Sequence, residues 1–124
     1  MRFIKDLQVR NDFNYIQTER KSLFDERYPG GIRICEWLKI NDEYSLSVQA
    51  SESHYCTPRA YLPLDQYKSF ELAIIYKDSL SKDIVEIKDF PKFDEILEYY
   101  NGSVFECVPK ELVEELYCWW LDKN

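Results

Sequence analysis

The sequence contains little glycine, one histidine and no long apolar segment, and each shortage excludes a class of function. Three glycines in 124 residues are too few for a glycine-rich phosphate loop, so nucleotide hydrolysis of the P-loop kind is excluded. With one histidine and no CxxC pair, neither a zinc site nor another cofactor is expected. No apolar run approaches the ~20 residues that cross a bilayer, and the first residues lack a signal peptide's apolar stretch. We therefore expect a cytoplasmic protein with reduced thiols.

The charge balance is acidic, with 16 basic against 23 acidic residues and a formal net charge of −7. That charge opposes binding to nucleic acid polymers and to anionic membranes, so neither is an expected partner. It suits docking on a basic protein. With 45% hydrophobic and 16% aromatic residues, the chain can bury a sizeable core, and we expect it to fold as a single domain, 1–124.

The first two thirds of the chain predict a sheet. Apolar residues at helical spacing indicate a short helix over 13–28, ended by Pro29-Gly30-Gly31. Alternating apolar and polar residues predict strands over 32–40, 44–50 and 67–76, the first two joined as a hairpin through an Asn-Asp-Glu turn. Residues 79–89 have no clean period, so either an added strand or an irregular crossing segment is compatible with them.

The last third predicts two helices flanking a short strand. A helix of about three turns begins at Pro91 and ends at Asn101-Gly102. Residues 103–108 resemble a strand, and Pro109 opens a second helix. The fold class is therefore α+β: an antiparallel sheet of three to four strands, in a sheet-rich part at about 30–88, followed by a helical part at about 90–122.

The helical part carries more large aromatic residues than one sheet face easily buries. Because aromatic residues concentrate in interface cores, we expect a subunit interface there. The aromatic residues concerned are Tyr99, Tyr100, Tyr117, Trp119 and Trp120.

Candidate functional residues gather in the loop after the second strand. Arg59 follows Pro58, and its guanidinium suits a phosphate, although an ion pair with a surface carboxylate is equally compatible with the sequence. His54 and Cys56 could form a nucleophilic pair, but a buried structural cysteine is the simpler interpretation. Arg27 and Arg33 flank the Pro-Gly-Gly bend and could converge with Arg59.

A second group of candidates lies at the start and end of the helix predicted after Pro91. An exposed Phe90 ring could stack on a base while the helix N-terminus at Pro91 faces a phosphate. The alternative is a ring that anchors the helix end to the core. Asn101 is most simply a helix stop, with a smaller chance of contacting a base edge.

Three segments carry a resemblance to a known family: SLSVQASESHYCTPR, DFPKFDEILEYY and VFECVPKELVEEL. They resemble the SIQAS, YCxPR, FPS and YVPxEIVEEL patterns of small phage and prophage proteins from low-GC Gram-positive bacteria, the anti-Thoeris sponge family of the first type. The similarity covers roughly the last two thirds of the chain. The chain departs from the pattern in a longer stretch before Phe90 and in Lys92, where a serine is expected.

The resemblance implies a non-catalytic phage counter-defence protein. Such a protein sequesters, without cleaving, a cyclic ADP-ribose-derived immune signal, and some members also capture cyclic oligonucleotides. It further implies dimers that assemble to a hexamer, Arg59 as a phosphate contact and Phe90 as the ring stacked on a base. Two other hypotheses remain: an acidic inhibitor or immunity protein that blocks a basic effector, and an enzyme using Cys56 with His54.

Overall fold

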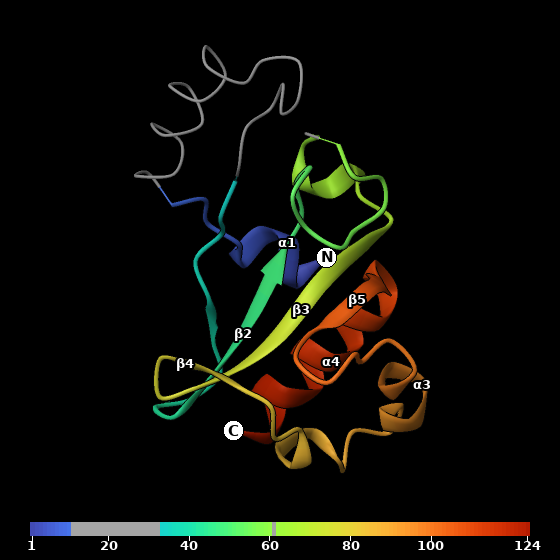
Figure 1. Ribbon diagram of the computed structural model, residues 1–124. Coiled ribbons are helices and arrows are strands. Elements are labelled where there is room, and N and C mark those ends of the chain that lie inside the picture. The colour runs from blue at the N-terminus through green and yellow to red at the C-terminus, as the bar shows by residue number, and fades with distance from the viewer. Residues whose placement is uncertain (11–32, 61) are drawn as a thin grey trace.

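The computed structural model describes residues 1–10, 33–60 and 62–124 (Figure 1). The helix predicted over 13–28, and Arg27 with it, lies outside the described residues. In chain order the described elements are α1 (Arg2–Asp6), β1 (Leu38–Lys39), β2 (Tyr44–Gln49), β3 (Ser69–Tyr76), β4 (Ser79–Ser81), α3 (Phe93–Leu97), β5 (Phe105–Pro109) and α4 (Lys110–Lys123). No helix in this part of the chain is both long and apolar enough to cross a membrane.

The predicted antiparallel sheet is confirmed, and β3 is its centre. β2 pairs with β3 along its whole length, from Tyr44 opposite Tyr76 to Gln49 opposite Glu71, and β1 pairs with β2 as the predicted hairpin. The other edge of β3 is shared, because β5 pairs with its first half and β4 with its second. Alternation places Phe70, Leu72 and Ile74 on one face of β3, where all three are buried in the core.

The first predicted strand is shorter than expected. Only Leu38 and Lys39 join the ladder with β2, although Cys35 forms an isolated bridge with Val9. The buried Gln49 side chain accounts for this difference. Its Oε1 accepts from the Cys35 N–H at 2.8 Å and its Nε2 donates to the Cys35 carbonyl at 2.9 Å, so a side chain replaces the backbone partner that β2 would supply.

The segment over 79–89 combines both alternatives that its sequence allowed. A two-residue turn with positive φ at Lys77 (47°) and Asp78 (66°) leads into β4, as hairpins of this length require. A 3₁₀ helix follows at Val85–Ile87 and buries Ile87.

The helix predicted from Pro91 is also shorter than expected. α3 has five residues, and its backbone bonds then shorten to the i−3 type, with Tyr99 N–H donating to Ile96 and Tyr100 N–H to Leu97. The chain next turns through Gly102, whose φ of 100° suits glycine. α4 is confirmed, since it begins directly after Pro109 and runs for 14 residues.

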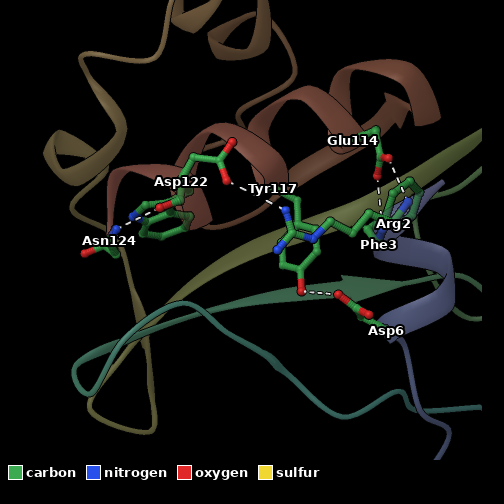
Figure 2. A network of polar contacts seen from close by, with 8 residues as sticks. Arg2, Phe3, Asp6, Glu114, Tyr117, Asp122 and Asn124 are labelled. Carbon is green, nitrogen blue, oxygen red and sulfur yellow. Dashed lines mark hydrogen bonds and ion pairs between the residues drawn. The ribbon is translucent and has the colours of Figure 1, made fainter.

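α1 and α4 lie side by side and are joined by polar contacts between opposite ends of the chain (Figure 2). The Glu114 carboxylate accepts from the backbone N–H groups of Arg2 at 2.7 Å and Phe3 at 3.0 Å. These N–H groups belong to the first turn of α1, where a helix offers them no carbonyl partner of its own. The Tyr117 hydroxyl donates to Asp6 at 2.7 Å. Burial and the Asp6 carboxylate both raise the pKa of Tyr117.

The aromatic residues of the helical part are largely covered by their own chain. Trp120 is fully buried and Tyr117 is 4% exposed, while Trp119 and Tyr99 are half-buried against the core. The Trp120 ring lies 5.8 Å from that of Tyr44, on β2. The surplus of aromatic area that suggested a subunit interface in this part is therefore used mainly inside the subunit.

Candidate functional site

The candidate site is loop 51–59, which leaves the end of β2 and returns to the start of β3. Thr57 pairs with Ser69, and the Lys68 N–H donates to the Thr57 carbonyl at 2.7 Å. The Cys107 N–H, on β5, donates to the Tyr55 carbonyl at 3.0 Å. The loop is thus attached to two strands of the sheet, and its Thr57–Pro58 peptide is cis.

Ser51 orients His54 within this loop. The fully buried Ser51 hydroxyl accepts from the Ser53 N–H at 3.1 Å and lies 2.7 Å from His54 Nδ1. The hydroxyl has one proton and a second lone pair, so it can donate to Nδ1 or accept from it, and the contact fixes the position of the imidazole ring without fixing its tautomer.

His54 is expected to stay neutral throughout the physiological range. Burial, together with the charges of Arg33 and Arg59, lowers its pKa from 6.5 to about 4. An imidazole in this setting can form a hydrogen bond with a ligand but contributes no positive charge at pH 7.

A pH titration checks directly whether His54 is neutral at pH 7. Between pH 6.5 and about 4 the unfolded chain binds a proton at His54 that the folded chain does not, so His54 destabilises the fold progressively as pH falls through that window. Because His54 is the one histidine, its imidazole carbon-bound proton gives a single titrating NMR signal. The expected midpoint is about 4 in the folded protein. Titration of the urea-unfolded chain supplies the control, and a folded midpoint at or above 6.5 contradicts the burial and orientation described.

Arg59 and Tyr55 lie together on the exposed side of the loop. The Arg59 guanidinium carbon lies 5.3 Å from the centroid of the Tyr55 ring, and Tyr55 is 43% exposed. Such a cation over an aromatic face is attractive and keeps the two side chains close together. The pair therefore offers both a phosphate-binding fork and an aromatic surface at the same place.

The half-buried Glu71 lies close to this pair. Burial and the neighbouring Glu106 carboxylate raise the pKa of Glu71, while the Tyr55 backbone N–H and the Arg59 charge act in the opposite direction. An anionic ligand bound to Arg59 would lie near the Glu71 carboxyl group, which repels it when ionised.

The Cys56 thiol is hydrogen-bonded to backbone carbonyl groups. Cys56 is 2% exposed, and its Sγ donates to the carbonyls of Ser51 at 3.2 Å and Pro58 at 3.4 Å. Burial raises its pKa, which disfavours the thiolate that a nucleophile needs. The imidazole of His54 is meanwhile engaged by Ser51. This arrangement favours the structural interpretation of Cys56 over the catalytic one.

Arg33, expected to converge with Arg59 on a ligand, is instead buried beneath the loop. It is 5% exposed and donates to the carbonyls of Leu62 at 2.8 Å and Ala50 at 2.9 Å. A guanidinium in that position does not reach a ligand at the surface. The alternation of the sequence near Arg33 gave no indication of this burial.

Phe90 is also buried, which corrects its predicted role as a base-stacking ring. It is 4% exposed and its ring lies 5.4 Å from that of Trp119, on α4. Phe90 thus anchors the start of α3 to the core, the alternative left open by the sequence. Pro91 beside it is exposed, and α3 is too short to offer an N-terminal anion site.

Asn101 forms the turn after α3. Its Oδ1 accepts from the backbone N–H groups of Ser103 and Val104, both at 2.9 Å, as an Asx turn does. This matches its interpretation as a helix stop. Neither Phe90 nor Asn101 has a described contact with loop 51–59.

Three hollows, of about 380, 250 and 510 Å³, border Trp37, and none of them is lined by a predicted site residue in the described part of the chain. The hollow of about 510 Å³ is lined by side chains of both charges, including Lys39, Asp42 and Asp78, and Lys39 forms an ion pair with Asp42 at 3.6 Å. Trp37 is 43% exposed. In the described ranges no three His, Cys, Asp or Glu side chains are close enough to hold a metal ion.

Tyr55 is the site residue that the sequence interpretation missed. The available signal was its place inside HYCTPR, between His54 and Arg59.

Comparison with protein-family models, with curated proteins and with solved structures found no match to this chain.

Proposed function

We propose that this protein is a non-catalytic binder that sequesters a cyclic nucleotide, with Arg59 and Tyr55 as the primary contacts. The observation that carries the proposal is the guanidinium of Arg59 held over the exposed Tyr55 ring. Arg59 binds a phosphate and Tyr55 stacks on a base, while the neutral imidazole of His54 supplies a further hydrogen-bonding group. Loop 51–59, SESHYCTPR, also lies within one of the three segments that carry the family resemblance.

The biological role that this proposal implies is phage counter-defence by removal of a cyclic ADP-ribose-derived immune signal. A sponge requires tight binding and no chemistry, because cleavage would release the products. The buried thiol of Cys56 and the neutral His54 fit a site that binds without reacting. Assembly of dimers into a hexamer belongs to the same proposal and rests on the family resemblance, since Tyr117 and Trp120 are buried within the subunit.

Ligand retention tests the proposed function. The purified protein is incubated with cyclic ADP-ribose, a cyclic dinucleotide and a cyclic trinucleotide, freed of unbound material by gel filtration, and heated to release what it holds. Mass spectrometry should recover at least one of these molecules intact and in stoichiometric amount. Linear ADP-ribose serves as the control ligand, and recovery of none of the cyclic molecules, or only of cleaved products, contradicts sequestration.

A second candidate function is an inhibitor of a basic protein, and Trp37 favours it. The exposed Trp37 ring borders a hollow lined by three acidic side chains, Asp42, Glu43 and Asp78, and by two lysines, Lys39 and Lys77. Aromatic residues are enriched among the residues that dominate protein interfaces, and acidic side chains complement a basic partner. The net charge of −7 acts in the same direction. Steep salt dependence of binding to a basic protein, with no nucleotide retained, would select this function.

A further inference from the structure

Arg33 and Tyr67 form a buried pair beneath loop 51–59. Arg33 is 5% exposed and Tyr67 fully buried, the Arg33 Nη2 donates to the Tyr67 hydroxyl at 3.1 Å, and the guanidinium carbon lies 5.5 Å from the Tyr67 ring centroid. Removing a guanidinium from water is costly, and an apolar residue of similar volume often stabilises a fold as well or better. A buried cation at this position therefore calls for an explanation beyond stability.

The hydrogen bonds of the pair reach both ends of the loop. Arg33 Nη2 donates to the carbonyl of Ala50, directly before the loop, and Nη1 to the carbonyl of Leu62, shortly after it. The Tyr67 hydroxyl accepts from the Leu62 N–H at 3.0 Å and donates to the carbonyl of Ala60, the residue after Arg59. Two side chains thus hold the entry and the exit of the loop to one buried point.

We propose that Arg33 and Tyr67 are positioning residues, which keep loop 51–59 in the conformation that presents Arg59 and Tyr55 to a ligand. A loop fixed before binding loses less conformational entropy on binding, so its contacts yield more affinity. Arg33 also places a positive charge under an acidic protein's anion-binding surface, as its effect on the His54 pKa indicates. The part of the proposal that concerns affinity rests on the proposed nucleotide binding, whereas the part that concerns loop order does not.

Tyr67→Phe tests the proposal, because it removes only the hydroxyl group, which binds Ala60, Leu62 and Arg33. Tyr117→Phe is the matched control, since Tyr117 is also buried and donates its hydroxyl, but to Asp6 on α1. Amide hydrogen exchange in the absence of ligand should be about 10-fold faster over 52–59 in Tyr67→Phe, with the β2 and β3 amides much less affected. In Tyr117→Phe the loop amides should change no more than those of the sheet.

Calorimetry with cyclic ADP-ribose supplies the second readout. Tyr67→Phe should weaken binding by about 5–10-fold and Tyr117→Phe should leave it unchanged, although both lower the melting temperature. Arg33→Lys, which keeps the charge but loses the fork that reaches Ala50 and Leu62, should behave like Tyr67→Phe. Loop exchange that rises only in step with the sheet amides overturns the positioning proposal. Failure of the wild type to bind the probe counts against the proposed ligand, and the exchange data then decide the positioning proposal alone.

Discussion

Replacing Trp120 by alanine is expected to lower the free energy of unfolding by about 3–5 kcal/mol, the largest stability effect of any substitution considered for this chain. Trp120 is fully buried, with its ring 5.8 Å from Tyr44. Its removal leaves a cavity between α4 and the sheet that the surrounding side chains fill only in part. Urea unfolding followed by circular dichroism measures the loss.

Two further variants distinguish a core role from the subunit interface that the sequence suggested. Trp119→Ala removes a half-buried ring packed against Phe90 and should cost about 1–2 kcal/mol. Trp120→Phe should also cost less than Trp120→Ala, because within the described residues the indole Nε1 has no hydrogen-bond acceptor and phenylalanine loses no such bond. Equal losses at 119 and 120, or a Trp120→Ala protein of unchanged stability that changes its molecular mass by light scattering, would contradict the core assignment.

Replacing Arg59 by alanine is expected to weaken binding of the retained cyclic nucleotide by about 10–100-fold, which corresponds to one charge-assisted phosphate contact. The fold should be unaffected, because Arg59 is exposed and no described salt bridge involves it. Tyr55→Ala should weaken binding by about 5–10-fold through loss of stacking. Isothermal calorimetry measures both affinities, and equal melting temperatures of the variants confirm that the fold is intact.

Lys77 provides a matched control for Arg59. Its ammonium lies 5.2 Å from the centroid of the Tyr76 ring, so it forms the same kind of cation–aromatic pair at the opposite end of β3. Lys77→Ala changes the net charge by the same amount as Arg59→Ala and should leave affinity unchanged. Equal weakening by the two variants would show that only general electrostatics matters, and the assignment of loop 51–59 as the binding site would fail.

The two candidate functions make opposite use of charge. Nucleotide binding requires a local positive site in a protein of net charge −7, and Arg59 together with the buried Arg33 provides one at loop 51–59. Docking on a basic protein uses the acidic side chains near Trp37, next to the turns at the far end of the sheet. Because the two surfaces use different residues, Arg59→Ala and Trp37→Ala separate the functions.

Local patterns were sufficient to predict the two longest strands and the last helix, although they did not predict α1. Alternation over 44–50 and 67–76 predicted β2 and β3, and the proline before residue 110 predicted the start of α4. Both signals work at short range, since a strand needs side chains that alternate and proline tolerates the first turn of a helix. The predicted strand over 32–40 was too long because Gln49, distant in sequence, occupies the Cys35 backbone groups.

For the site, the sequence by itself determined the residue types and their clustering: HYCTPR brings an imidazole, an aromatic ring, a thiol and a guanidinium into one loop. Only the tertiary structure decided which of the candidate residues, inside and outside this loop, face solvent. It buried Phe90 against Trp119, placed Arg33 under the loop and left Tyr55 beside Arg59 at the surface. The physical reason is that burial depends on what lies across the sheet or the loop, and those partners, such as Tyr67 for Arg33, are far away along the chain.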